Sequence, residues 1–314
     1  MSVSRANLIG GPGKATWNAI TMFARADMAA SFDASWQDLK SSHHGLIDKV
    51  VTDRMIKVSL SLWGAWENIA TLFPSALLNP VPGTRIYGTT DLPLVLHKKT
   101  GSAERITIHN AQITRLANLY LGVDADMFAA DVEFTGLIKN SGNPEDANAY
   151  YTVDSFAYTD ITFAKTNFSR QRYGAVWGLS PFAAFQLHKG ANIEWELDLQ
   201  AEYNANVGTV DMIIGDGGLV ARCKGIPLEP TAAQIDARLL FQGAGNPLGS
   251  LLSDGASDLV LTGSAPSAII TLKGAAITGW RPVMGAIPLL NGEVTWETTR
   301  GITAGTGAAI ATAT

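Results

Sequence analysis

The feature that most constrains the fold is an internal repeat. Residues 106–114 (ITIHNAQIT) align with residues 270–278 (ITLKGAAIT) at an offset of 164 positions. Chance matches between strand-rich segments would scatter, so an ordered series at near-constant offset predicts a duplicated domain. Two copies of one fold give a chain internal pseudo-symmetry, which suggests assembly before catalysis. Further matches follow in the same order at offsets of 160 to 167: Trp17 with Trp177, Phe23 with Phe185, Asp91-Leu92 with Asp258-Leu259, and residues 131–134 with 293–296.

The length of the chain fits this division. Its 314 residues are long for one hydrophobic core, and each half has the size of an ordinary domain, about 150 residues. We place the boundary after residue 155, which gives predicted domains 1–155 and 156–314. The segment 140–149, rich in Asn, Gly and Pro, is the expected hinge region.

Charged residues are scarce. They make up 16% of the chain, whereas an average globular protein has about 25%. Such a surface is either covered by partner subunits or belongs to a compact, robust monomer, and composition alone leaves both open. The net charge is −5, and neither half has the basic footprint of a nucleic-acid reader.

Targeting and redox signals point to the cytoplasm. The single Cys223 excludes an internal disulfide framework, and its alternating flanks favour a small half-buried residue over a nucleophile. The N-terminal residues lack the apolar core of a secretory signal. No run of 18 apolar residues occurs, so we expect no membrane span.

The hydrophobic pattern predicts a mainly β protein. Residues 58–62 and 193–199 alternate between apolar and polar, as half-buried strands do. Residues 66–73, which end at Pro74, and residues 231–241 have helical spacing. The order strands, helix, strands in each half predicts two tandem β-sandwich or β-barrel domains, each with one flanking α-helix. The Gly, Ala and Thr-rich residues after Arg300 are predicted to form an extended or disordered tail.

Motifs for catalysis or cofactor binding are incomplete. Residues 10–15 lack the first Gly and the Ser or Thr of a phosphate-binding loop. His43 and His44 are adjacent, which on a strand puts them on opposite faces and favours a solvated loop over a metal site. Asp124 and Asp126 lack the other oxygen ligands of a calcium loop. We therefore expect no enzyme activity, cofactor or metal; a hydrolase would need a convergent carboxylate pair that sequence spacing does not reveal.

An acidic strand face is the strongest polar pattern. Glu194, Glu196 and Asp198 share one side of the predicted strand 192–202, and no run of Lys or Arg lies nearby in sequence. Like charges about 7 Å apart require a wet face. The face is either an ordinary solvated surface or the lining of a channel that repels a polyanion. Glu133 and Glu293 mark smaller acidic faces of the same kind.

Four segments, taken in order, resemble the major tail tube protein of long-tailed bacteriophages. They are residues 11–17, 64–74, 92–97 and the run from Phe134-Thr135-Gly136 to Tyr151-Thr152-Val153. The resemblance covers roughly residues 8 to 155 and rests on the order of the segments, none of which is diagnostic alone. It implies a β-sandwich with a flanking helix, assembled as a ring that closes an inner β-barrel around the passing genome. This chain departs by carrying a second copy, which implies three chains per pseudo-sixfold ring.

An exposed hairpin or loop is expected over residues 35–52, replaced in the second half by a short turn at residues 215–218. Polar residues 40–45 are followed by the apolar pairs Leu46-Ile47 and Val50-Val51, which are unfavourable in water. We therefore expect the stretch to reach a neighbouring subunit or ring. The inter-ring candidates are Ser41, Ser42, His43, His44, Gly45, Leu46 and Ile47.

The resemblance implies a structural subunit of the virion tail, assembled in the host cytoplasm. Its implied partners are itself, a tape measure protein, a tail terminator and genomic DNA in transit, with no membrane. Glu194, Glu196, Asp198, Glu133 and Glu293 are then the lumen-facing candidates. The alternative is a duplicated β-sandwich module of a virion that binds a receptor or carbohydrate. Exposed Trp and Tyr around a pocket favour that alternative, whereas open strand edges and an acidic concave sheet favour the tube.

Overall fold

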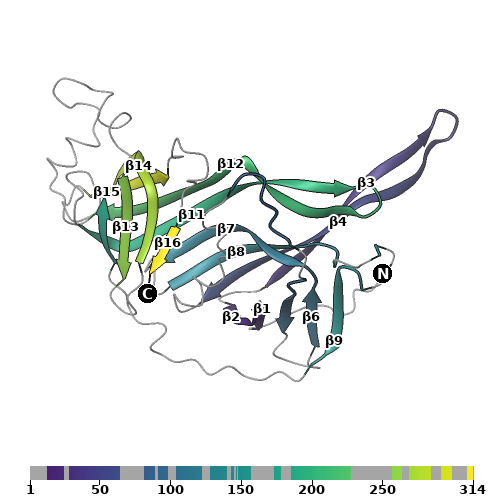
Figure 1. The fold of residues 1–314 in the computed structure, drawn as a ribbon, viewed down its shortest axis with the longest axis horizontal. Helices are drawn as coiled ribbons and strands as arrows, with labels where there is room; N and C mark the ends of the chain where they lie inside the picture. Colours follow the sequence, from purple (N-terminus) through teal and green to yellow (C-terminus); the bar gives the residue numbers. More distant parts are fainter. Residues whose placement is uncertain are drawn as a thin grey trace.

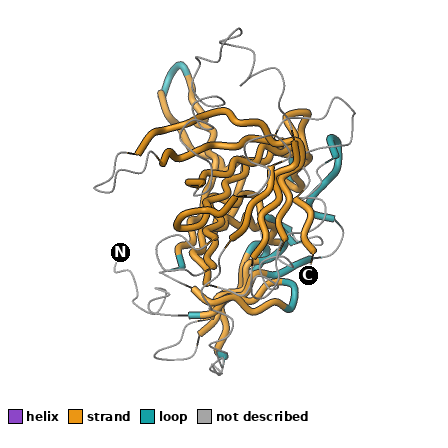
Figure 2. The backbone as a smooth tube through the Cα atoms, turned by 90° about the vertical axis from the view of Figure 1, so that its left-hand side faces the viewer, coloured by secondary structure: helices purple, strands orange, loops and turns teal. Residues whose placement is uncertain are grey.

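The computed structural model describes the larger part of the 314 residues. The described residues are 13–24, 28–63, 81–88, 91–97, 104–121, 128–139, 143–144, 146, 148–156, 173–177, 185–227, 257–263, 269–283, 291–298 and 310–313. They form sixteen strands in one antiparallel sheet system, so the mainly β prediction is confirmed (Figure 1). No helix occurs in this part of the chain (Figure 2), and therefore none that is long and apolar enough to cross a membrane. The predicted helices at 66–73 and 231–241 lie outside the described residues.

The strands fall into two sets in chain order. The first set is β1 (Lys14–Trp17), β2 (Ile20–Ala24), β3 (Ala29–Ser41), β4 (Gly45–Trp63), β5 (Leu94–His97), β6 (Glu104–Ile108), β7 (Ala111–Leu121), β8 (Phe128–Gly136) and β9 (Tyr151–Ser155). The second set is β10 (Tyr173–Trp177), β11 (Phe185–Asn204), β12 (Gly208–Pro227), β13 (Ser257–Gly263), β14 (Ile269–Val283), β15 (Asn291–Thr298) and β16 (Ile310–Ala313). β16 lies within the predicted C-terminal tail.

Alternation along the strands builds the core. In β4, Val58, Leu60 and Leu62 are buried, whereas Lys57 and Ser59 point to the other face. Successive strand residues face opposite sides, so an alternating sequence buries one whole face. The buried rings of Trp17 and Phe134 meet edge to face with centroids 5.5 Å apart.

The first set closes on itself. Strand pairings run from β4 through β2, β1 and β5 to β6, and a second series runs from β7 through β8 back to β4. His109 and Asn110 form the corner between β6 and β7. This closed route folds the strands into a sandwich-like body, and β9 adds to it along β6. At the two ends of the predicted hinge region 140–149, Lys139 N donates to Ala149 O at 3.0 Å.

The second set follows the same route. Pairings run from β12 through β11, β10 and β13 to β14, and return through β15 to β12. The long strand β14 covers the positions of both β6 and β7, and β16 pairs with it as β9 pairs with β6. The registers agree as well: Leu94 pairs with Ile108, and Leu259 pairs with Leu272.

A polar corner recurs in both sets. The Asp91 carboxylate accepts from the backbone N–H of Asn110, and the Asp258 carboxylate accepts from that of Gly274 at 3.0 Å. Asn110 and Gly274 both have positive φ, 42° and 57°. Each Asp also lies near the basic side chain that precedes this residue: Asp91 Oδ2 is 3.4 Å from His109 Nδ1, and Asp258 Oδ2 is 2.6 Å from Lys273 Nζ. The left-handed corner turns the strand from one layer to the other, and the carboxylate satisfies the amide left free there.

The long hairpins correspond too. β3–β4 and β11–β12 both turn through a Gly of positive φ, Gly45 and Gly208. The expectation that residues 215–218 form a short replacement turn is wrong, because they lie inside β12 at a register shift between Leu197 and Leu199. A Gly-rich run has the composition of a turn, yet here the extra residues are taken up as a bulge.

Candidate functional site

The two sets meet through backbone pairing of β7 with β11. Leu119 of β7 pairs with Ile193 of β11, and Leu116 pairs with Trp195. Leu116, Leu119 and Ile193 are buried, and Asn192 Nδ2 donates to Asn118 Oδ1 at 3.0 Å on the other face. One sheet therefore continues from β3 through β4, β8 and β7 into β11, β12, β15 and β14.

A second contact fixes the tip of the β11–β12 hairpin on β4. Thr209 donates from its backbone N–H to Asp53 Oδ1 at 2.8 Å and from Oγ1 to Asp53 Oδ2 at 2.7 Å. A side chain at Gly208 would meet Asp53 Oδ1 at 2.6 Å, so only Gly allows this approach. Tyr203 Oη donates to Thr52 O at 3.0 Å. Sequence analysis missed these residues because their partners lie more than 150 positions apart and no local pattern marks them.

A third contact comes from the segment 81–88. Gly83 N donates to Ile214 O at 2.8 Å, Ile214 N donates to Thr84 O at 2.9 Å, and Arg85 pairs with Glu202. Tyr87 Oη donates to Thr135 O at 2.6 Å, and burial raises the pKa of this phenol. The segment thus adds to β12 and anchors in the first set.

Two strand edges stay open at the ends of the shared sheet. Among the described strands, β3 pairs with β4 alone. Within the same part of the chain, residues 277–283 of β14 pair with β15 alone. By register, β3 corresponds to β11, and this part of β14 corresponds to β7. The internal joint pairs β7 with β11. The two strands that correspond to them, β14 and β3, are the ones with open edges.

The hairpin β3–β4 projects from the body (Figure 1) and carries the predicted inter-ring residues at its tip. Residues 42–44 form the turn, in which Ser41 Oγ accepts from His43 N at 3.1 Å. The rings of His43 and His44 lie 4.6 Å apart, and no cluster of potential metal ligands occurs among the described residues. Leu46 and Ile47, 52% and 62% exposed, follow Gly45.

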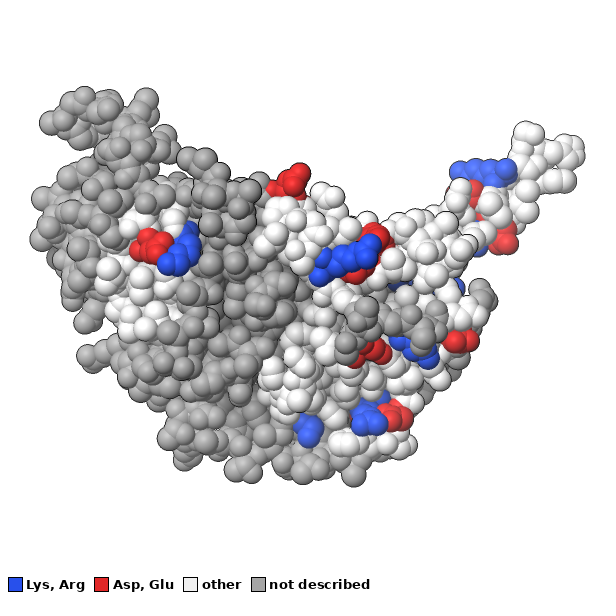
Figure 3. All heavy atoms as spheres, viewed as in Figure 1, with Lys and Arg blue, Asp and Glu red and all other residues white. Residues whose placement is uncertain are grey.

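Apolar side chains occupy both faces of this hairpin. Trp36 pairs with Val51 on one face, while Leu39 and Val50 lie on the other. Trp36 is 58% exposed. Asp38 bridges to Lys49 at 3.8 Å, and Figure 3 shows acidic and basic atoms together along the hairpin. An arm with exposed apolar groups on two faces is suited to insertion between other protein surfaces.

The predicted acidic face is a mixed polar face. The Glu194 carboxylate accepts from Lys224 Nζ at 2.9 Å, and Glu297 accepts from Arg222 Nε at 2.9 Å. Lys224 comes from the paired strand β12, thirty residues away, so the sequence around Glu194 gives no sign of this basic partner. Glu196 and Asp198 lie further along β11, Glu133 lies on β8 and Glu293 on β15.

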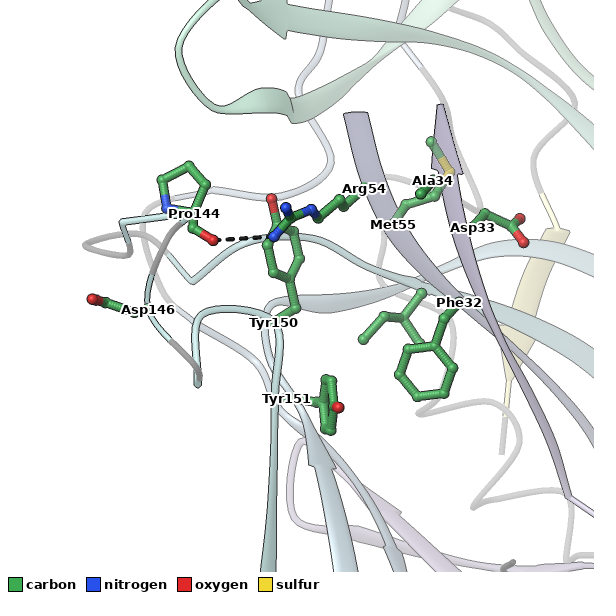
Figure 4. A pocket seen from close by; sticks show the side chains of 10 residues that line it. Phe32, Asp33, Ala34, Arg54, Met55, Pro144, Asp146, Tyr150 and Tyr151 are labelled. Carbon is green, nitrogen blue, oxygen red and sulfur yellow. Dashed lines mark hydrogen bonds between the residues drawn. The ribbon is translucent and has the colours of Figure 1, made fainter. Parts of the chain in front are cut away.

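An aromatic hollow of about 390 Å³ lies at the base of the projecting hairpin. Phe32 and Tyr151 meet edge to face in it with centroids 5.1 Å apart, and Arg54 donates to Pro144 O at 3.2 Å (Figure 4). Its lining comprises Phe32, Asp33, Ala34, Arg54, Met55, Ile56, Pro144, Asp146, Tyr150 and Tyr151. Phe32 and Ala34 belong to the open edge strand, so the hollow borders that edge.

Cys223 is fully buried beside Trp296 in the sheet. Burial raises the pKa of its thiol to about 12, so the reactive thiolate is scarce at neutral pH. No protein-family model matches the sequence, and no curated protein matches it.

Proposed function

We propose that this chain is a structural subunit, a tandem duplication of one β-sandwich domain that polymerises into rings and then a tube. The observation that carries the proposal is the internal joint. Two equivalent strand sets are joined edge to edge through β7 and β11, and the counterparts of those strands are left open on β14 and β3. A contact that joins halves of one chain also joins copies head to tail, and such a contact closes a ring when the rotation allows.

The open edge of β3 favours this function on energetic grounds. An unpaired strand edge presents a row of backbone donors and acceptors that templates pairing with another chain. Proteins that remain monomeric commonly blunt such edges with Pro, short strands or inward charges. Here β3 runs for 13 residues without Pro and with exposed Phe32 and Trp36. Self-pairing hides both the backbone and these rings.

The polar face is our candidate for the wall of a lumen. Each strand set packs its second layer, which contains β1 and β5 or β10 and β13, against one face of the shared sheet. If the shared sheet closes into a ring, its outer face has the larger circumference, so the second layer fits on the outside of the ring. Glu133, Glu194, Glu293 and their neighbours then face inward. A lumen wall of net negative charge would discourage DNA phosphates from binding.

We propose that this assembly is the tail tube of a long-tailed bacteriophage, with three chains per pseudo-sixfold ring. Its partners are further copies, the tape measure and terminator proteins, and DNA in transit; its place is the virion tail, assembled in the host cytoplasm. The protein has no catalytic role in this proposal. Support comes from the sequence resemblance of residues 8 to 155 together with the open edges.

The binding-module alternative has one observation in its favour. The hollow at the hairpin base gathers Phe32, Tyr150 and Tyr151 around an exposed site, and aromatic side chains suit receptor or carbohydrate binding. The hollow borders the edge that self-pairing would cover, so the two functions compete for the same surface.

Light scattering over a wide range of concentration and salt separates the two proposals. The tube proposal predicts trimers or longer polymers whose mass rises with concentration. A mass of 33.3 kDa throughout supports the binding module and overturns the tube.

A further inference from the structure

The internal joint fixes how two chains would pair. Residues of β3 and β11 correspond through the strands beside them: Ile193 pairs with Cys223, and Ala30 pairs with Val58. Cys223 and Val58 in turn oppose Trp296 and Phe134. Ala30 therefore holds the place of Ile193, and two residues along, Phe32 holds the place of Trp195.

The other edge is mapped in the same way. Leu116 of β7 pairs with Val132, and Trp280 of β14 pairs with Val294. Further along the same strands, Tyr120 of β7 pairs with Ala129, and Val283 of β14 pairs with Asn291. Trp280 thus holds the place of Leu116, and Val283 holds that of Tyr120.

A joint between β3 of one chain and β14 of another would have a more regular strand register than the internal joint between β7 and β11. β7 has a register shift between Leu116 and Asn118 that β14 lacks, and the internal joint accordingly shifts between Ile193 and Trp195. Across β3 and β14, the pairs transferred from the internal joint fall into one unbroken antiparallel register.

We infer that residues 29–32 of β3 in one chain pair antiparallel with residues 280–283 of β14 in a second copy of this chain. Ala29 lies opposite Val283, and Phe32 lies opposite Trp280. The inference rests on the proposed self-assembly and names its contact. The pairing covers Phe32, which is 57% exposed in the single chain, and the mouth of the hollow beside it.

Cysteine cross-linking between two singly substituted proteins tests the register. Ala29→Cys in one preparation and Val283→Cys in another are mixed and oxidised mildly. The matched control replaces Ala29→Cys by Ser35→Cys, a conservative change on the same edge about 20 Å further along the strand. The buried native Cys223 remains in every variant and does not compete.

The expected result is a covalent heterodimer from Ala29→Cys with Val283→Cys, at least about tenfold more abundant than from the Ser35→Cys control, because disulfides need Cα atoms within about 7 Å. Light scattering on the same mixtures reports assembly independently. Assembly without this preference overturns the register and leaves the proposed function standing. Absence of both assembly and cross-links overturns both.

Discussion

The indole nitrogen of Trp17 lies 2.7 Å from the carbonyl oxygen of Ala111 and donates a buried hydrogen bond to it. In the second strand set, Trp177 Nε1 donates to Ala275 O at 2.8 Å. The two bonds join equivalent strands at offsets of 160 and 164 positions. A chance alignment would match residue types only, whereas here the same hydrogen bond, from a Trp indole N–H to a backbone carbonyl oxygen, occurs in both strand sets.

Replacing either Trp by Phe should destabilise the protein by a similar amount. Each change leaves a buried carbonyl without its donor, which costs about 1–3 kcal/mol. Urea unfolding of Trp17→Phe and Trp177→Phe measures this. Exposed Trp36→Phe is the control and should be nearly neutral in the isolated chain. A cost at one buried site only would contradict the equivalence of the two sets.

The residue type found at the corner of one strand set should be tolerated at the corner of the other. Gly274 has φ of 57°, and its counterpart Asn110 has φ of 42°. Gly274→Asn should therefore be tolerated, whereas Gly274→Val should be less stable by about 1–2 kcal/mol, since a branched side chain opposes a left-handed backbone. Thermal unfolding of the two variants checks the difference. Equal stability would contradict the predicted corner geometry.

Acid should destabilise the first strand set through His97. Burial, with Lys14 and Arg105 nearby, lowers the pKa of His97 to about 4 against the opposing effect of Asp154. The unfolded chain takes up this proton near pH 6.5, before the folded chain does, so stability should fall as the pH drops from about 6.5 toward 4. Urea unfolding at pH 7 and pH 4.5 measures the loss.

The variant His97→Gln should lose less stability over that interval than the wild-type chain. The exposed variant His43→Gln is the control and should keep the wild-type dependence. Parallel pH profiles for His97→Gln and the wild-type chain would refute the role of this histidine.

The projecting hairpin should serve assembly and not folding. Replacing residues 40–47 by Asn-Gly joins the paired residues Leu39 and Asp48 with a two-residue turn that suits a hairpin. The variant should unfold at the same urea concentration as the wild type, within about 0.5 kcal/mol, because surface changes cost little. Its tubes should fail to form. Normal tubes from this variant would show that the tip is not an assembly element.

Sequence patterns predicted the strands well where burial is one-sided. The alternation of residues 58–62 and 193–199 correctly predicts strands within β4 and β11, because a strand with one buried face alternates apolar and polar residues. The repeat also matches Asp91 with Asp258, and in the structure each accepts a hydrogen bond from the backbone N–H at the corner of its own set. Long-range partners were not predictable: Lys224 neutralises Glu194 from a paired strand, and Asp53 holds Thr209 from the other set. Pairing between strands sets such contacts, and one sequence carries no signal of it.

Negative-stain microscopy of the purified chain tests the central claim most directly. The account predicts closed rings with six similar lobes, built from three chains, and stacks of such rings at higher concentration. Dispersed particles of a single chain at every concentration would contradict it.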